Sequence, residues 1–284
     1  MTGTDLGTVT SLWRYPIKSM MGEELNASSV AERGLVGDRA YALVDEADGK
    51  VVSAKQPRKW GRLFDFRAAF SDPPHAEKPI PPVWITLPNG DRVSSAQHDI
   101  EAILSGVLGR AVMLRATAPD APTVEYLEDP LAPVETMSDF PAALGAPKGT
   151  FFDYAPLHLL TTATLDRLRE AYPRGRFEAR RFRPNLVVES PSDATGFVEN
   201  AWVGHRLTIG QDVRVQVTDP CPRCVMTTMP QGDLPKDLGI LRAAADHNRP
   251  HISFANQDMP SVGVYARVVR GGTIRRGDRL RLED

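Results

Sequence analysis

Residues 219–228 read DPCPRCVMTT and hold both cysteines of this 284-residue chain. The alternating apolar run at residues 213–217 precedes them, and this period predicts a strand that delivers the two thiols. Prolines on both sides of Cys221 remove backbone donors and stiffen the approach. We therefore expect a rigid loop that presents a thiol beside Arg223.

The composition is that of a globular protein with a sizeable core, because 42% of the residues are hydrophobic and 25% are charged. A formal net charge of −2 gives no general reason to expect nucleic acid or an anionic membrane as a partner. Two cysteines cannot staple a chain of this length, which favours a reducing compartment. Residues 1–5 lack the basic and apolar segments of a signal peptide, and no run approaches the ~18–20 apolar residues that span a bilayer. We expect a cytoplasmic protein with no nucleic-acid or membrane partner.

Short strands separated by turn residues dominate the sequence. Asp48-Gly49 and Asn89-Gly90 each predict a hairpin, and Phe64 and Phe66 mark another short strand. No βαβ alternation of a parallel sheet is visible. This pattern predicts a mostly β, α+β architecture that resembles a β-barrel with a few helices. Helical periodicity marks those helices over 99–108, from Thr161 or Thr162 up to Pro173, and over 238–247.

Residues 117–148 contain six prolines and little periodicity. They predict either a connection between two units or an ordered loop that covers an active site. We therefore divide the chain into a β-rich N-terminal module at 1–116, a proline-rich connection at 117–150 and a second domain at 151–284.

The two cysteines allow three kinds of chemistry. A zinc site would use Cys221 and Cys224 with His247 and His251, but the gap before His247 exceeds the ~12–15 residues of a zinc finger. A dithiol redox pair has the right C-x-x-C spacing but lacks the βαβ context of thioredoxin-like folds. A single thiolate can bind a soft metal when a cofactor supplies the other ligands.

The third option predicts cationic residues for an anionic cofactor, and such residues are ordinary surface features when taken alone. Lys18-Ser19, Arg39 and the run Arg180 to Arg183 are the available positions. The sequence has no G-x-S-x-G elbow, no Walker-type loop and no G-x-G-x-x-G motif after a strand.

Taken together, these motifs resemble a known family. YPIKS at residues 15–19 and GDR at 37–39 are similar to the N-terminal β-barrel module of many MOSC-domain proteins. FRPNLVV at 182–188, CPRCVMTT at 221–228 and GTIRRGD at 272–278 resemble the MOSC domain, named for the C-terminal domain of the molybdenum cofactor sulfurase. The nearest pattern is that of the mitochondrial amidoxime-reducing components and their bacterial counterparts.

The resemblance implies a pterin-based molybdenum cofactor, or molybdopterin-Mo, whose metal is bound by the second cysteine, Cys224. Cys221 has no such role and packs or supports the site. The positions that match cofactor-binding residues of the family, the last three less securely, are Lys18, Ser19, Arg39, Arg183, Asn185, Thr161, Arg223 and Tyr265. We also name Asp219 as a candidate general acid because it adjoins the cysteine loop.

The implied activity is reduction of N–O bonds in small N-hydroxylated compounds such as amidoximes and hydroxylamines. No ferredoxin-like domain follows the MOSC-like end, so we expect electrons from a separate protein of the ferredoxin or flavin reductase type. The alternative is a carrier that holds molybdenum cofactor, or sulfur as a persulfide on Cys224, for another enzyme. Residues 117–148 and 229–259 depart most from the family pattern and are expected to shape the substrate pocket.

Overall fold

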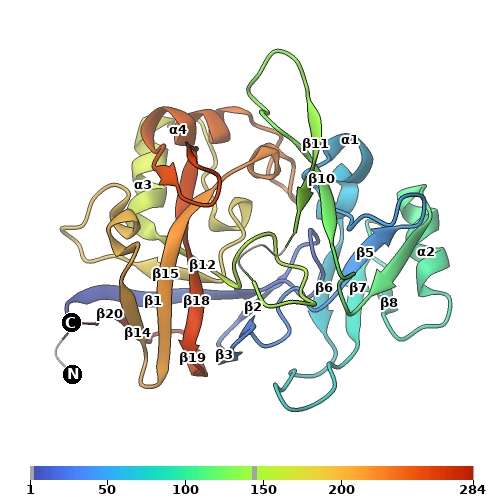
Figure 1. Ribbon diagram of the computed structural model, residues 1–284, viewed down its shortest axis with the longest axis horizontal. Coiled ribbons are helices and arrows are strands. Elements are labelled where there is room, and N and C mark those ends of the chain that lie inside the picture. Colours follow the sequence, from blue (N-terminus) through green and yellow to red (C-terminus); the bar gives the residue numbers. More distant parts are fainter. Residues whose placement is uncertain (1–2, 143–145, 284) are drawn as a thin grey trace.

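The computed structural model describes residues 3–142 and 146–283, and its centre is a closed barrel of seven strands (Figure 1). Strand β1 (Asp5–Arg14) closes the ring because it pairs with β13 (Leu186–Glu189) on one side and β20 (Arg279–Leu282) on the other. The ring continues through β12 (Leu157–Thr161), β18 (Ser261–Arg270), β15 (Val213–Pro222) and β14 (Arg206–Ile209). The mostly β, barrel-containing fold is therefore confirmed.

Alternation along β15 shows why these residues form a barrel wall. Val213, Val215 and Val217 are completely buried and point inward, because successive side chains of a strand face opposite sides. Fully burying each valine contributes roughly 1.5–3 kcal/mol. Strand β15 runs on through Cys221 to Pro222, so the first cysteine belongs to the wall itself and only the second lies in a loop.

One pair of barrel strands is parallel, although the sequence shows no βαβ alternation of a parallel sheet. Strands β12 and β13 run side by side in the same direction, with helix α3 (Thr162–Ala171) between them in sequence. The hydroxyl of Thr161 accepts a hydrogen bond from the Thr164 amide at 3.2 Å, so the predicted capped start of this helix is confirmed. A single βαβ unit among antiparallel strands leaves no repeating sequence pattern to detect.

The second part of the fold lies beside the barrel and is built mostly from residues 16–115 (Figure 1). The hairpin predicted at Asn89-Gly90 is confirmed and joins two strands of the β6–β7–β8 sheet. Strand β2 (Glu23–Leu25) pairs with β1, and β3 (Ala27–Ala31) and β4 (Gly34–Leu35) pack on the barrel core. The elements of the second part are β5 (Ala42–Asp45), α1 (Pro57–Trp60), β6 (Arg67–Phe70), β7 (Val83–Thr86), β8 (Arg92–Ser94), α2 (Ile100–Leu108) and β9 (Val112–Arg115).

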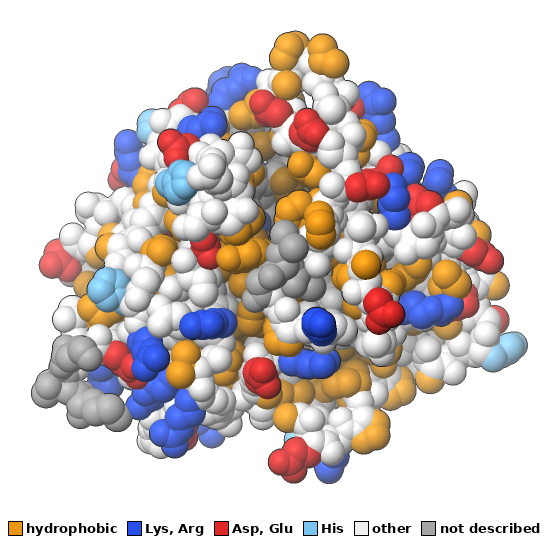
Figure 2. Space-filling model, in the orientation of Figure 1, with side chains coloured by type: hydrophobic (Ala, Val, Ile, Leu, Met, Phe, Trp, Pro, Cys, Tyr) orange, Lys and Arg blue, Asp and Glu red, His pale blue; other side chains and the backbone are white. Residues whose placement is uncertain are grey.

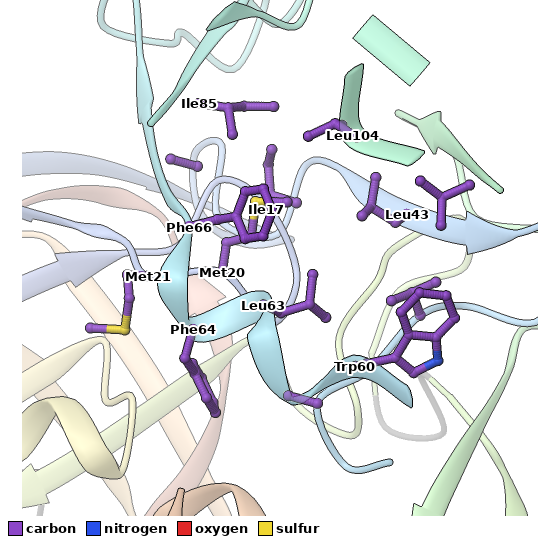
Figure 3. Packing of buried hydrophobic residues seen from close by; sticks show 14 of the residues in the cluster. Ile17, Met20, Met21, Leu43, Trp60, Leu63, Phe64, Phe66, Ile85 and Leu104 are labelled. Carbon is purple, nitrogen blue, oxygen red and sulfur yellow. The ribbon is translucent and has the colours of Figure 1, made fainter. Parts of the chain in front are cut away.

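The strand predicted at Phe64 and Phe66 is wrong, because residues Gly61–Asp65 form a 3-10 helix and β6 starts only at Arg67. Both aromatic rings are nevertheless buried. Figure 3 shows the Phe66 ring beside Ile17, with Phe64 directed away from it. Two buried aromatic residues two apart therefore imitated the period of a strand.

Regular structure also occurs where the prolines argued against it. Within residues 117–150, β10 (Thr123–Leu127) and β11 (Met137–Pro141) form a hairpin that rises between the barrel and the N-terminal part (Figure 1). Pro130 and Pro133 lie in the loop of this hairpin, where no ladder hydrogen bond is required. Residues 143–145, which belong to the predicted connection, lie outside the described residues, as do residues 1–2 of the segment assessed for a signal peptide and residue 284.

The remaining elements are α4 (Gly239–His247), β16 (His251–Ile252), β17 (Gln257–Asp258) and β19 (Gly272–Arg275). They lie at both ends of the barrel, with α4 near one end and β19, which pairs with β3, near the other (Figure 1). The predicted division at residues 116 and 151 stays a prediction, although β1 of the N-terminal segment is an integral barrel strand. No helix of the described residues is long and apolar enough to cross a membrane.

Candidate functional site

A cavity of about 220 Å³ lies where the barrel, the N-terminal part and the β10–β11 hairpin meet. The space-filling view shows the surface hollowed between the hairpin and the barrel (Figure 2). Five cationic side chains and two carboxylates, Asp153 and Glu128, are part of its lining, so the net charge favours an anionic ligand. The residues predicted from the sequence that line it are Lys18, Ser19, Arg39, Arg183, Asn185, Arg223, Cys224 and Tyr265.

Three of these residues adopt a backbone conformation that is rare for residues with side chains. Ser19, Arg39 and Arg183 have φ angles of 64°, 47° and 54°. In the described part of the chain, Asn256 is the only other non-glycine residue with positive φ, and its neighbour Ala255 also lines the cavity. Such conformations cost about 1–3 kcal/mol each and cluster at functional sites. Their gathering around one cavity therefore makes it the candidate functional site.

Tertiary contacts hold these conformations. The Ser19 hydroxyl accepts a hydrogen bond from the Ala54 amide at 3.1 Å, which leaves its proton available to a ligand. The Arg39 amide donates to the Tyr15 carbonyl at 2.8 Å, and its guanidinium pairs with Asp38. The guanidinium also lies 5.0 Å from the centre of the Tyr15 ring. The lining cations are therefore fixed in place before any ligand arrives.

Two arginines of the cavity, the buried Arg183 and the partly buried Arg223, have unused donors. Arg183 Nη1 donates to the Met20 carbonyl at 2.7 Å, whereas Arg183 Nη2 is buried without a partner. Arg223 Nη2 donates to the Phe182 carbonyl at 2.8 Å, whereas Arg223 Nε is buried without a partner. Burial lowers the pKa of Arg183 to about 10, which leaves it charged at neutral pH. A buried unpaired donor costs about 1–3 kcal/mol, so these nitrogens favour an acceptor-rich ligand.

Asp153 joins two lysines at the cavity. Lys18 Nζ lies 2.6 Å from Asp153 Oδ1, and Lys55 Nζ lies 3.2 Å from Oδ2. Burial raises the pKa of Asp153, but the two ammonium groups outweigh this and hold the pKa well below its usual range. Burial lowers the pKa of Lys18, partly offset by Asp153. The arrangement keeps the carboxylate ionised and orients both ammonium groups.

A buried carboxylate behind the cavity orders Asn185. Asp38 Oδ2 accepts from Asn185 Nδ2 at 3.0 Å, and Asp38 Oδ1 accepts from the Tyr15 amide at 2.7 Å. The side-chain oxygen of Asn185 accepts from the His158 amide at 3.1 Å. Burial, reinforced by the charge of Arg223, lowers the pKa of His158 to about 3, so this residue is neutral.

The two cysteines lie in different surroundings, and both are free thiols. Cys221 is only 1% exposed, and its Sγ lies 2.7 Å from Arg223 Nη1. Cys224 is partly exposed at the same cavity. No three His, Cys, Asp or Glu side chains of residues 3–142 and 146–283 form a group that could hold a metal. The zinc alternative with His247 and His251 is therefore wrong for these residues.

Two predicted residues do not line the cavity. Thr161 caps α3, and its hydroxyl donates to Glu199 Oε2 at 2.6 Å. Asp219 is buried and accepts a hydrogen bond from the Tyr154 hydroxyl at 2.9 Å. Of this pair, Tyr154 is the residue that reaches the cavity, so any proton exchange of Asp219 with a ligand would pass through that hydroxyl.

Several lining residues were not identified from the sequence. Lys55 and Asp153 carried no local motif, and their function follows only from the three-dimensional contact with Lys18. Three of the four aromatic wall residues, Tyr126, Phe140 and Phe254, come from the segments expected to shape the pocket, whereas Tyr154 lies between those segments. On the hairpin, the ring centres of Tyr126 and Phe140 are 5.9 Å apart. The rings of Tyr154 and Phe254 are stacked, with their centres 3.9 Å apart.

Comparison with known proteins agrees with this architecture. Family models for the MOSC N-terminal beta barrel domain and the MOSC domain match residues 6–69 and 146–281. Mitochondrial amidoxime reducing component 2 of Rattus norvegicus is 27% identical over 293 residues, covering 96% of this chain and 82% of the relative. The Homo sapiens protein of the same name is 24% identical over 299 residues with the same coverage.

Among solved structures, the YUAD protein from Bacillus subtilis aligns over 97% of this chain and 94% of that chain, with a TM-score of 0.42 and 10% identity. This likeness is too weak to carry an argument. The two family models, which follow one another in the expected order, and the relatives that match along nearly the whole chain decide the assignment. The chain belongs to the MOSC-domain proteins, as a MOSC N-terminal beta barrel domain followed by a MOSC domain.

Proposed function

We propose that this protein binds a molybdenum cofactor and reduces the N–O bonds of small N-hydroxylated compounds. The names of its relatives, amidoxime reducing components at 24–27% identity, support an oxidoreductase of this class. The observation that carries the proposal is that two arginines lining the cavity beside Cys224 each have a buried nitrogen without a partner, Arg183 Nη2 and Arg223 Nε.

The donor set of the cavity fits a pterin that carries a phosphate and a thiophilic metal. Guanidinium and ammonium groups neutralise phosphate, and the unused Arg183 and Arg223 donors match its oxygens. Hydroxyl and amide groups suit the polar edge of a pterin. Cys224 supplies one thiolate for the metal. In this assignment the phosphate and pterin are held by Lys18, Ser19, Arg39, Arg183, Asn185 and Arg223, with Tyr265 beside them.

The bound cofactor would supply the two electrons that cleave an N–O bond, a reaction that consumes two protons and releases water and the reduced nitrogen compound. The protein orients the substrate and excludes water with the aromatic walls formed by Tyr126, Phe140, Tyr154 and Phe254. The pair Tyr154–Asp219 is the proposed path for one proton, because Tyr154 lines the cavity and its hydroxyl donates to Asp219.

Electrons are proposed to come from a separate protein of the ferredoxin or flavin reductase type, and the cytoplasmic location stays a prediction. Thr161 has no place in this mechanism, because its hydroxyl is occupied by Glu199 and by the cap of α3.

The test combines metal analysis with turnover. Protein from a host that makes the cofactor is analysed for molybdenum and assayed for conversion of benzamidoxime to benzamidine with reduced benzyl viologen. We expect near-stoichiometric molybdenum and turnover in the wild type and in Cys221→Ser, and neither in Cys224→Ser. An active, molybdenum-replete Cys224→Ser variant would refute the ligand assignment. A loaded wild type that shows no turnover but transfers cofactor to an apo-enzyme would identify a carrier.

A further inference from the structure

Five arginines cover the outer face of four neighbouring barrel strands, and we call them the arginine face. Strand register places them in two rows. In one row Arg281 lies opposite Thr208, Thr208 opposite Arg214, and Arg214 opposite Arg270. In the other, Arg206 lies opposite Gln216, and Gln216 opposite Arg267.

The fold forces these side chains outward. Their neighbours along the strands, including Leu207, Val215, Ala266 and Leu280, are completely buried in the barrel core. Alternate residues of a strand face opposite sides, so the residues between these apolar positions must point to solvent. Figure 2 shows Lys and Arg side chains gathered on the lower left, where Figure 1 places β14, β15 and β18.

Acidic neighbours compensate this charge only in part. Arg214 pairs with Glu283 at 2.7 Å and Arg270 with Asp212 at 3.8 Å. Three further arginines form no ion pair with any residue of 3–142 or 146–283: Arg206, Arg267 and Arg281. Arg214 and Arg270 lie directly opposite each other, and each already has an acidic neighbour, Glu283 and Asp212 respectively. The charge available to an acidic partner is therefore mainly that of Arg206, Arg267 and Arg281.

The arginine face continues into the cavity. Tyr265 lines the cavity and lies two residues before Arg267 on β18, hence on the same outer side of that strand. At about 3.3 Å per residue, the Cα atoms of these two residues are roughly 7 Å apart. Val269, beyond Arg267, is 47% exposed and gives the face an apolar contact point. A protein docked here would lie beside the mouth of the proposed redox site.

From this arrangement we infer that the arginine face is the docking surface for an acidic electron-donor protein. The inference rests on the proposed function, because a donor is needed only if the cavity performs a reduction. Complementary charge accelerates and orients such encounters, and electron-transfer complexes are small and transient. A small patch of mixed arginine and valine suits this kind of contact.

The experiment compares Arg206→Glu/Arg267→Glu with the control Lys78→Glu/Lys236→Glu, which changes the net charge equally at exposed positions elsewhere. The probe is an acidic plant-type [2Fe–2S] ferredoxin, reduced by NADPH and its flavoprotein reductase. At low ionic strength we expect the double arginine variant to bind it at least about tenfold more weakly and to lose turnover with it in proportion. Turnover with reduced benzyl viologen should change less than about twofold, and the control should match the wild type.

The outcomes separate the two proposals. Absence of turnover with the dye in the loaded wild type would refute the proposed function, while the ferredoxin dissociation constants still test the surface. Equal weakening in both double variants would overturn the arginine face, since only overall charge would then matter. Unchanged ferredoxin binding together with lost binding to phosphatidylserine vesicles would overturn it in favour of a membrane surface.

Discussion

Arg183 Nη1 donates a hydrogen bond to the carbonyl oxygen of Met20 at 2.7 Å, across 163 positions of the sequence. The same guanidinium lies 4.1 Å from the centre of the Tyr15 ring and 5.7 Å from that of Phe64. One side chain in the loop that leads into β13 is thus held by the N-terminal part of the fold, while its Nη2 has no partner. The same side chain therefore links the two parts of the fold and provides an unused donor at the cavity.

We expect Arg183→Lys to reduce both cofactor retention and stability although it preserves the charge. A single ammonium group cannot both bond the Met20 carbonyl and present a second planar donor. The loss of one charge-assisted hydrogen bond is about 1.5–3 kcal/mol. Molybdenum content and the midpoint of urea unfolding measure the two effects. Arg180→Lys, on the surface of the same segment, is the control and should change neither; a loaded, fully stable Arg183→Lys protein would contradict this prediction.

Thr161→Ala should lower stability without changing molybdenum content per folded chain. The substitution removes the cap of α3 and a hydrogen bond to the buried carboxylate of Glu199, a loss of about 1–2 kcal/mol for the cap alone. Thr161→Ser keeps the hydroxyl and should restore most of the stability. Thermal unfolding measures the stability of both variants, and metal analysis measures their molybdenum content. Loss of molybdenum without loss of stability in Thr161→Ala would show that Thr161 binds the cofactor.

His158 should make the protein less stable in mild acid. Its folded pKa of about 3 lies below the ordinary value of 6.5, so the unfolded chain binds the additional proton between these values. Stability is therefore complete above pH 6.5 and falls by up to about 1.4 kcal/mol per pH unit below it. His158→Gln should flatten this part of a urea-unfolding profile, whereas exposed His205→Gln should not. An unchanged slope in His158→Gln would show that other groups cause the acid sensitivity.

Asp153→Asn should destabilise the protein by about 1–2 kcal/mol at neutral pH. This loss is smaller than that for a fully buried ion pair, because the Asp153 side chain is 31% exposed. The substitution leaves Lys18 and Lys55 without their shared counter-ion. Because the folded-state pKa of Asp153 lies below the ordinary value of 3.8, its contribution is present above about pH 4 and is lost as the pH falls. The difference between variant and wild type should thus narrow in acid.

The control for this experiment is Asp139→Asn, which breaks the more exposed Lys50 pair on the hairpin and should cost less than about 0.5 kcal/mol. Unfolding free energies from urea titrations between pH 7 and pH 3 give the comparison. A difference that stays constant over this range would show that Asp153 acts through packing and not through its charge.

The local patterns predicted much of the fold because their causes are local. A capping threonine and a following proline defined α3, and alternating valines defined the inner wall of β15. Phe64 shows the limit of such patterns, because two buried aromatic residues two apart satisfy a strand period while the backbone forms a 3-10 helix. The β10–β11 hairpin shows another limit, since its prolines fall in positions that need no ladder donor.

For the site, the sequence was sufficient to name Cys224 and most of the cations, because short motifs in a fixed order carry that information. It did not show that Lys18 and Lys55 both form ion pairs with Asp153. Nor did it show that Asp219 accepts a hydrogen bond from Tyr154, or that Thr161 donates one to Glu199. Each of these facts depends on contacts between residues distant in the chain. Local preference determines which residues begin a helix or face a barrel core, but only closure of the barrel by β1 brings separate loops to one cavity and decides which charges remain unpaired there.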